Sequence, residues 1–297
     1  MSPFALPTAT LAGGFLLIVT GSALFTRSIE STVARFFENR NRGLRILGNL
    51  SLSLPELILP LIAFLSPGAS RSRIDAGTGA LFGPPLFLCL ALLPIAFFLH
   101  RPQARSLARE APLIVAGLSA AILLSGHSFL PRLFLALCLL ALYLGGLLLT
   151  PGHGDNREAP ESASGWGIPD ALFLGGGAIL MALGSQAFLS GIEALREIRG
   201  VSPFWTALLL GPVATEAPEL LTLTHFLRKR SLPEAFSILW GSIHLQTTLS
   251  IAVGILASPW TGSPSAAQAG LALGGLLGIL SILGYLRRNR GPDGDFP

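Results

Sequence analysis

The sequence predicts an all-α membrane protein, folded as an inverted-repeat helical bundle. Three observations indicate this fold class. The 297 residues are 51% hydrophobic and only 12% charged, and their mean hydropathy is +0.65. Apolar segments of about 20 residues, the length that crosses a bilayer as a helix, recur along the whole chain. The two halves of the chain also resemble each other when one is shifted onto the other by 163 residues.

The internal similarity is strongest near the start of each half. Residues 11–30 align without gaps with residues 174–193, and nine of the twenty positions are identical. The same shift carries the Pro-Glu-Leu run at 55–57 onto the run at 218–220. A duplicated membrane unit with an acid at the same depth of each half is typical of secondary transporters. Glycines in these segments are expected to permit close helix packing or sliding: Gly13, Gly14, Gly21, Gly175, Gly176, Gly177 and Gly184.

Nine apolar segments are predicted to span the membrane. Each should be a helix, because the bilayer interior offers no water to backbone polar groups. They cover residues 9–28, 44–65, 76–99, 111–129, 131–150, 168–192, 202–227, 234–257 and 266–286.

A polar linker rich in Pro, Gly and Ser at residues 151–167 divides these spans into two groups. The first repeat is predicted to cover residues 1–150 with five helices, and the second residues 168–288 with about four. The bundle is therefore 5 + 4, or 5 + 5 if a tenth helix exists, and residues 289–297 are expected to be a disordered tail. Because five is odd, the second repeat enters the membrane from the opposite side and the repeats are inverted.

The basic residues indicate the orientation. Fifteen of the 20 Lys and Arg residues lie in one alternate set of loops and five in the other. The positive-inside rule then places the N-terminus outside and the C-terminus in the cytoplasm. The net charge of +4 thus reports topology and gives no reason to expect nucleic acid as a partner. Nineteen Arg against one Lys is typical of a GC-rich bacterial genome, which predicts the bacterial inner membrane.

Three carboxylates lie within the second and seventh predicted spans: Glu56, Glu216 and Glu219. An ionised carboxylate at the bilayer centre costs roughly 2.5–3.5 kcal/mol even on lenient scales, and no Lys or Arg lies in the central turns of any span. Protons or bound cations are the remaining partners. Prolines beside these acids predict broken helices near the midplane, where freed carbonyls and hydroxyls would complete an oxygen-lined cation site. The alternative is that the acids are permanently protonated packing groups.

The eighth predicted span supplies further candidates. Ser242 and His244 lie near the middle of an apolar segment. The imidazole of His244 is a possible proton relay, since histidine titrates near neutral pH. The alternative is a structural histidine that is simply hydrogen-bonded.

Motifs of several enzyme classes are absent from the sequence. It contains no His-Glu-x-x-His zinc motif, no Gly-x-Ser-x-Gly elbow and no phosphate-binding loop. Its two cysteines both lie in apolar spans and form no metal or disulfide motif. The chain is therefore not expected to be an enzyme or to carry a cofactor.

The acid motifs resemble those of the cation/calcium antiporter superfamily, which includes the sodium/calcium and calcium/proton exchangers. That family carries Gly-Thr-Ser-x-Pro-Glu in each inverted repeat. The corresponding runs here are Ser-Leu-Ser-Leu-Pro-Glu at 51–56 and Ala-Thr-Glu-Ala-Pro-Glu at 214–219. The resemblance implies that Glu56 and Glu219 are the metal ligands. It adds oxygen ligands from Ser53, Thr215 and Ser242, and Glu216 stands where the family has Ser.

The next helix of each family repeat carries amide or acid ligands, and this sequence departs from them. The corresponding positions are Ala80, Pro85, Ile238 and Ile243, whose side chains cannot ligate. We therefore expect weaker Ca²⁺ binding than in family members with intact motifs. The clustered carboxylates predict stronger coupling to H⁺ than to Na⁺, because neighbouring carboxylates raise one another's pKa.

The predicted function is secondary-active antiport by alternating access, in which Ca²⁺ or another cation exchanges for Na⁺ or H⁺. One alternative is a proton-coupled transporter of another small solute. A second is a degenerate exchanger that acts as a non-transporting membrane subunit. The expected partners are inorganic cations and the lipid bilayer, and the sequence does not indicate an oligomeric state.

Overall fold

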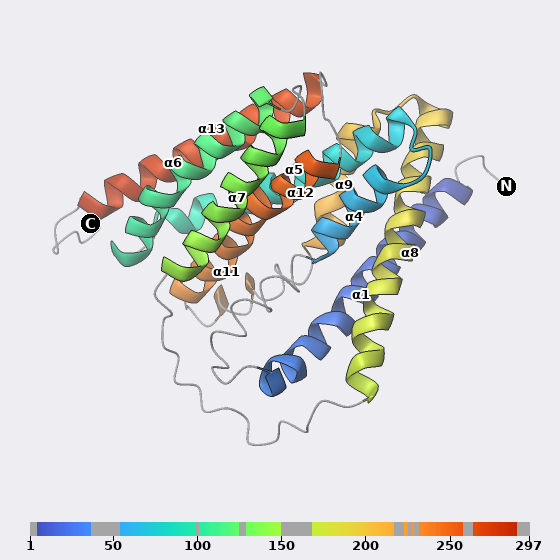
Figure 1. Cartoon of the computed structure of the whole chain (residues 1–297), viewed down its shortest axis with the longest axis horizontal. Helices are drawn as coiled ribbons and strands as arrows, with labels where there is room; N and C mark the ends of the chain where they lie inside the picture. Colours follow the sequence, from blue (N-terminus) through green and yellow to red (C-terminus); the bar gives the residue numbers. More distant parts are fainter. Residues whose placement is uncertain are drawn as a thin grey trace. The chain divides into compact units, whose positions relative to one another are not determined.

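Every regular element in the described part of the chain is helical. The computed structural model describes residues 5–36, 54–98, 101–124, 129–149, 168–216, 223–224, 227–228, 232–257 and 264–289. The elements are α1 (Ala5–Phe36), α4 (Leu54–Leu65), α5 (Arg71–Ala96), α6 (Arg101–Leu124), α7 (Phe129–Leu149), α8 (Ile168–Arg199), α9 (Pro203–Thr215), α11 (Leu232–Leu245), the π-helix η2 (Gln246–Ser250), α12 (Ile251–Ala257) and α13 (Pro264–Asn289) (Figure 1).

All nine segments that the sequence predicts as spans contain helix within the described residues. Among the residues that the structure describes, five stretches are long and apolar enough to cross a membrane. They are Ala5–Phe25, Arg71–Ala96, Ile168–Arg199, Leu239–Ala257 and Ser265–Arg287. Large apolar side chains also stand on the outer surface, such as Leu172 on α8 and Leu271 on α13, which are 67% and 73% exposed. The prediction of an all-helical membrane protein is confirmed.

The helices form two compact units, and each unit draws on both sequence repeats. The first unit consists of residues 1–81 and 147–218, and the second of residues 82–146 and 219–297. The boundary between Leu81 and Phe82 falls inside α5. The compact units therefore do not coincide with the sequence repeats. The repeat limits at 1–150 and 168–288 remain a prediction about how the chain was duplicated and how it crosses the membrane.

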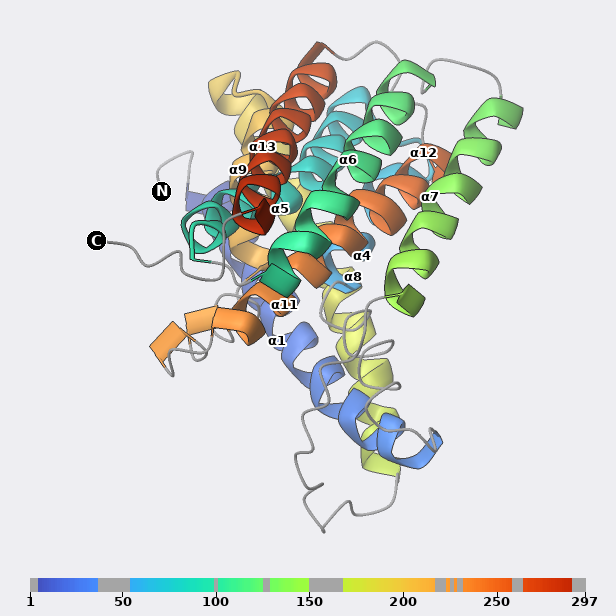
Figure 2. The same cartoon turned by 90° about the vertical axis from the view of Figure 1, so that its left-hand side faces the viewer.

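In the first unit, α1 and α8 pack along each other over much of their length (Figures 1 and 2). Their glycines make reciprocal contacts. A Cβ added at Gly14 would lie 2.7 Å from the carbonyl oxygen of Gly184, and one at Gly21 would lie 2.7 Å from that of Gly177. The 163-residue shift carries Gly14 onto Gly177 and Gly21 onto Gly184. Each repeat thus presents the same two glycines to the other in antiparallel order, as a two-fold relation requires.

The first half of α5 packs against both α4 and α9. A Cβ at Gly77 would lie 2.5 Å from the Cβ of Ala63 on α4, and one at Gly79 would clash with the carbonyl oxygen of Phe204 on α9. Neither position can carry a larger residue without moving a neighbouring helix. These two glycines therefore bring the helices that carry the candidate acids close to α5.

The second unit is organised around α6. Along one side it packs against α13, where a Cβ at Gly284 would lie 2.9 Å from the carbonyl oxygen of Ala104 (Figure 2). It also contacts α11, η2 and α12. Arg132, at the start of α7, reaches the carbonyl oxygen of Ile255 on α12 at 3.5 Å.

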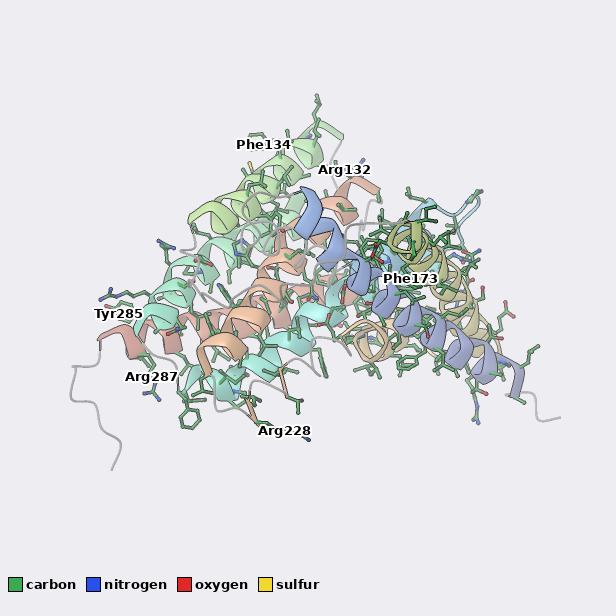
Figure 3. The ribbon with its side chains drawn as sticks, turned by 90° about the horizontal axis from the view of Figure 1, so that it is seen from below. Arg132, Phe134, Phe173, Arg228, Tyr285 and Arg287 are labelled. Atoms are coloured by element: carbon green, nitrogen blue, oxygen red, sulfur yellow. The ribbon has the colours of Figure 1, made fainter. Side chains whose placement is uncertain are left out.

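Aromatic and basic side chains lie on the surface of this unit (Figure 3). Tyr285 is 52% exposed near the end of α13, close in sequence to Arg287, while Phe134 on α7 is 69% exposed. Tyrosine and arginine at a helix end are suited to the membrane–water interface. This placement agrees with the predicted membrane boundary near the end of α13.

Candidate functional site

Glu56 lies in the first turn of α4 and is only 2% exposed. The partial positive charge of a helix N-terminus favours a carboxylate in that turn. Pro60, one turn later, has no N–H and cannot donate to the carbonyl of Glu56, the residue four positions earlier. Glu56 is thus a buried carboxylate beside a proline, and its assignment as a cation ligand remains a prediction.

Glu216, in contrast to Glu56, lies at the C-terminal end of a helix. It directly follows α9, its N–H donates to the carbonyl of Pro212 at 2.8 Å, and the residue is fully buried at 0% exposure. The neighbouring Thr215 is 1% exposed, and its hydroxyl donates to the carbonyl of Gly211 at 3.2 Å. A helix C-terminus carries partial negative charge, so a buried carboxylate there favours a positive partner.

Two predicted ligands, Ser53 and Glu219, lie outside the described residues. Within the described residues, no group of three or more His, Cys, Asp or Glu side chains is placed to hold a metal ion. Because Glu219 is not part of that comparison, the predicted pairing of Glu56 with Glu219 remains a prediction. The ligand assignments of Thr215, Glu216 and Ser242 also remain predictions.

Ser242 and His244 belong to the second unit, where they lie on α11 and are 6% and 7% exposed. The helix changes from α to π geometry immediately afterwards, at Gln246–Ser250. Single π turns inside helices occur frequently at functional sites. The hydroxyl of Thr247 donates to the carbonyl of Ile243 at 2.6 Å, and the hydroxyl of Thr248 to that of His244, so side chains satisfy carbonyls where the helix is irregular.

A buried polar cluster in the second unit surrounds Glu110 on α6. The indole N–H of Trp240 donates to Glu110 Oε2 at 2.8 Å, and the hydroxyl of Ser106 donates to Oε1 at 2.8 Å. The Nδ1 atom of His244 lies 3.6 Å from Glu110 Oε2, and Arg109 lies 3.3 Å from Oε1. Glu110 is 6% exposed and Trp240 is 5% exposed.

The other ring nitrogen of His244, Nε2, lies 3.3 Å from the carbonyl oxygen of Leu142 on α7. Both ring nitrogens therefore face oxygens that can only accept hydrogen bonds. His244 is engaged with α6 and α7, as the hydrogen-bonded alternative expects, while its role as a proton relay remains a prediction.

The sequence analysis did not find Glu110, since it lies one residue before the apolar segment expected at 111–129. In the structure α6 begins ten residues earlier, at Arg101. The sequence spacing of the polar residues could have indicated this cluster. Ser106 and Glu110 are four residues apart, as are Trp240 and His244. Residues at this spacing lie on one helix face.

A second polar cluster ties α8 to the start of α5 in the first unit. Glu193 accepts a hydrogen bond from the hydroxyl of Ser70 at 2.7 Å and pairs with Arg73 at 3.4 Å. Arg73 also donates to the side-chain oxygen of Gln186 at 2.9 Å. Glu193 is thus a helix-end anchor, the role that its position near the end of a span favours.

The comparisons with known proteins show the family and the fold of the chain. The description "Sodium/calcium exchanger protein" belongs to the family that matches residues 6–150 and 170–291, which is most of the chain. The chain belongs to the sodium/calcium exchanger family. Its fold class and its place among membrane transporters follow from that membership. A comparison with curated protein sequences gave no match.

Solved structures of exchangers share the fold. The H⁺/Ca²⁺ exchanger CAX matches with a TM-score of 0.67 and 18% identity, over 97% of this chain and 82% of that one. Native YfkE matches with a TM-score of 0.63 and 13% identity, over 95% and 88% of the two chains. The sodium-calcium exchanger NCX_Mj matches with a TM-score of 0.50 and 18% identity, over 96% and 91%. At these identities the likeness concerns the fold alone.

Proposed function

We propose that this member of the sodium/calcium exchanger family is an antiporter that moves Ca²⁺ or another cation against H⁺, with Na⁺ as a weaker coupling ion. The observation that carries the proposal is the complete burial of Glu216 at the C-terminal end of α9. A carboxylate that is removed from water and placed at the negative end of a helix is stabilised by a proton or a cation. A site that accepts either one can exchange them.

The first unit supplies a second acid in a compatible setting. Glu56 is also buried, and the prolines of α4 and α9 cannot donate to the carbonyls four residues before them. Cations such as Ca²⁺ prefer several oxygen ligands of this kind. We propose Glu56 and Glu219 as the principal ligands, with oxygens from Ser53, Thr215, Glu216 and Ser242 around them.

The departures from the family pattern bear on the choice of coupling ion. With Ala80 and Ile243 at ligand positions, the third and eighth spans lack the side-chain ligands that the family carries there. This favours H⁺, which needs one acceptor, over Na⁺, which needs a coordination shell. The inner-membrane location, the outward N-terminus and the alternating-access mechanism belong to the same proposal.

Purified protein in liposomes tests the proposal directly. Gradients of H⁺, Na⁺ and K⁺ are imposed one at a time, and uptake of Ca²⁺ is followed. We expect a H⁺ gradient to drive more uptake than a Na⁺ gradient of the same size. Uptake that follows Na⁺ and ignores pH would contradict the H⁺ coupling. Absence of cation flux under every gradient would contradict antiport and favour the non-transporting subunit.

A further inference from the structure

The buried cluster around Glu110 connects α6 to α11 through a single oxygen atom. Glu110 Oε2 accepts the N–H of Trp240 at 2.8 Å and lies 3.6 Å from Nδ1 of His244. These two partners are four residues apart on α11, so they project from the same face of that helix. One carboxylate oxygen therefore holds two successive turns of α11 against α6.

Ser242 lies midway between these two anchors. Each residue advances an α-helix by about 100°, so Ser242 is turned roughly 200° from Trp240 and by the same angle from His244. Glu110 thus contacts the face of α11 that lies opposite Ser242. Any rotation of α11 about its axis that moved Ser242 would have to break the contacts of Glu110.

We propose that Glu110 is a positioning residue for cation exchange, which fixes the direction of Ser242 by holding Trp240 and His244. The inference rests on the proposed function, in which Ser242 contributes an oxygen to the cation site. Glu110 itself need not touch the cation.

The way the cluster is built supports a positioning role. Ser106 and Arg109, both on α6, hold the other oxygen, Oε1, at 2.8 and 3.3 Å. The carboxylate is therefore fixed on its own helix before it meets α11. Trp240 is further fixed by stacking on Phe236, with ring centroids 6.2 Å apart. A hydrogen bond between two side chains that are already held loses little entropy when it forms.

The π-helix that follows explains why such an anchor is useful. The regular register of α11 ends at Leu245, only three residues after Ser242. Beyond that point the hydrogen bonds follow the wider π spacing, so the residues after Leu245 do not continue the regular α register that includes Ser242. An external anchor on α6 then sets the orientation of the last regular turns.

Transport kinetics in liposomes test the inference. The Michaelis constant for Ca²⁺, or for whichever cation the gradient experiment shows to move, is measured for four variants. Glu110→Ala removes the anchor, and Trp240→Phe removes the N–H donor while keeping a ring. Glu110→Gln keeps an oxygen that can accept the indole N–H, and Ser106→Ala removes a bond to Glu110 that does not involve α11.

We expect Glu110→Ala and Trp240→Phe each to raise the Michaelis constant roughly two- to tenfold, the factor that one hydrogen bond gives. The double variant should be no worse than the more affected single variant, because both changes remove the same contact. Glu110→Gln should keep the Michaelis constant of the unmodified protein. Ser106→Ala should raise it less than Glu110→Ala does, because Arg109 still holds Oε1 and the contacts with α11 remain. A merely structural role would lower the amount of active protein, and hence the maximal rate, and leave the Michaelis constant unchanged.

The possible outcomes separate this inference from the proposed function. Flux with an unchanged Michaelis constant in both Glu110→Ala and Trp240→Phe would overturn the positioning role alone. Absence of flux in the unmodified protein would overturn the proposed function and the positioning role with it. Should Glu110→Ala fail to insert, Trp240→Phe against Ser106→Ala decides the question.

Discussion

The reciprocal glycine contacts between α1 and α8 lead to a prediction that the chain can test with its own control. Gly13 and Gly14 are adjacent residues of one helix. A Cβ at Gly14 would lie 2.5 Å from the backbone nitrogen of Phe188 and 2.7 Å from the carbonyl oxygen of Gly184, whereas one at Gly13 would meet nothing within 4 Å. Alanine at the two positions therefore differs mainly in its effect on the α1–α8 contact.

The expected size of the effect follows from these distances. Non-bonded carbon atoms prefer a separation of about 3.5–4.0 Å, so Gly14→Ala must push α8 away by roughly 1 Å. Overpacking of this kind costs typically about 1–3 kcal/mol. Both substitutions share the gain of about 0.5–1 kcal/mol that alanine has over glycine within a helix. The difference between the two variants should thus be about 1–3 kcal/mol, with Gly14→Ala the less stable.

Thermal unfolding of the purified protein in detergent measures this difference. Gly14→Ala should melt several degrees below Gly13→Ala. The repeat supplies a second pair, because the 163-residue shift carries these positions onto Gly177 and Gly176. A Cβ at Gly177 would lie 2.7 Å from the carbonyl oxygen of Gly21, and one at Gly176 would meet nothing within 4 Å. Equal melting temperatures within both pairs would refute the close contact between α1 and α8.

Three further predictions follow from the acids and the topology. Glu56→Gln and Glu219→Gln should each abolish cation flux in liposomes while the protein remains inserted and folded, and ordinary flux in either variant would remove that residue from the site. Glu216→Ser, which restores the family residue, should flatten the dependence of transport on pH, because one exchangeable proton is lost; an unchanged pH profile would count against Glu216. A reporter that is active only in the cytoplasm should work when fused after Pro297, and activity of a periplasmic reporter there would mean that the spans were miscounted.

The fold class could be predicted from the sequence because membrane helices obey simple rules. A helix that crosses lipid must be apolar over a fixed length and must satisfy its own backbone, so the spans are visible in composition alone. The close packing of Gly14, Gly21, Gly177 and Gly184 was also predictable from the repeat. The same expectation was wrong for Gly13, Gly175 and Gly176, which have open space around them. A run of glycines cannot show which member faces the neighbouring helix.

Polar contacts between distant segments that the repeat does not relate were beyond prediction from one sequence. Glu110 and Trp240 are separated by 130 residues, and nothing in the composition around either residue points to the other. Hydropathy also misjudges where α6 begins, because its first turns carry charged residues such as Arg105 and Arg109. A charged residue that is satisfied by partners from another helix looks, in the sequence alone, like part of a loop.

The two repeats differ in chemistry at the positions aligned with the π-helix η2. The 163-residue shift carries Pro84 and Pro85 of α5 onto Thr247 and Thr248, which lie in the π-helix. The prolines cannot donate to the carbonyls four residues earlier. In the second repeat, by contrast, the hydroxyls of Thr247 and Thr248 donate to carbonyls of the preceding turn.

This difference bears on the lost ligand side chains. Ala80 stands where the family has a polar ligand, yet Pro84 deprives the backbone carbonyl of Ala80 of its helical donor. A backbone oxygen is therefore left at the residue whose side chain cannot ligate. The second repeat has no proline at the corresponding position. There the hydroxyl of Ser242, next to Ile243 in the sequence, is the side-chain oxygen that could replace the lost ligand. The two repeats thus differ at adjacent aligned positions, with a backbone oxygen at Ala80 in the first and a side-chain oxygen at Ser242 in the second.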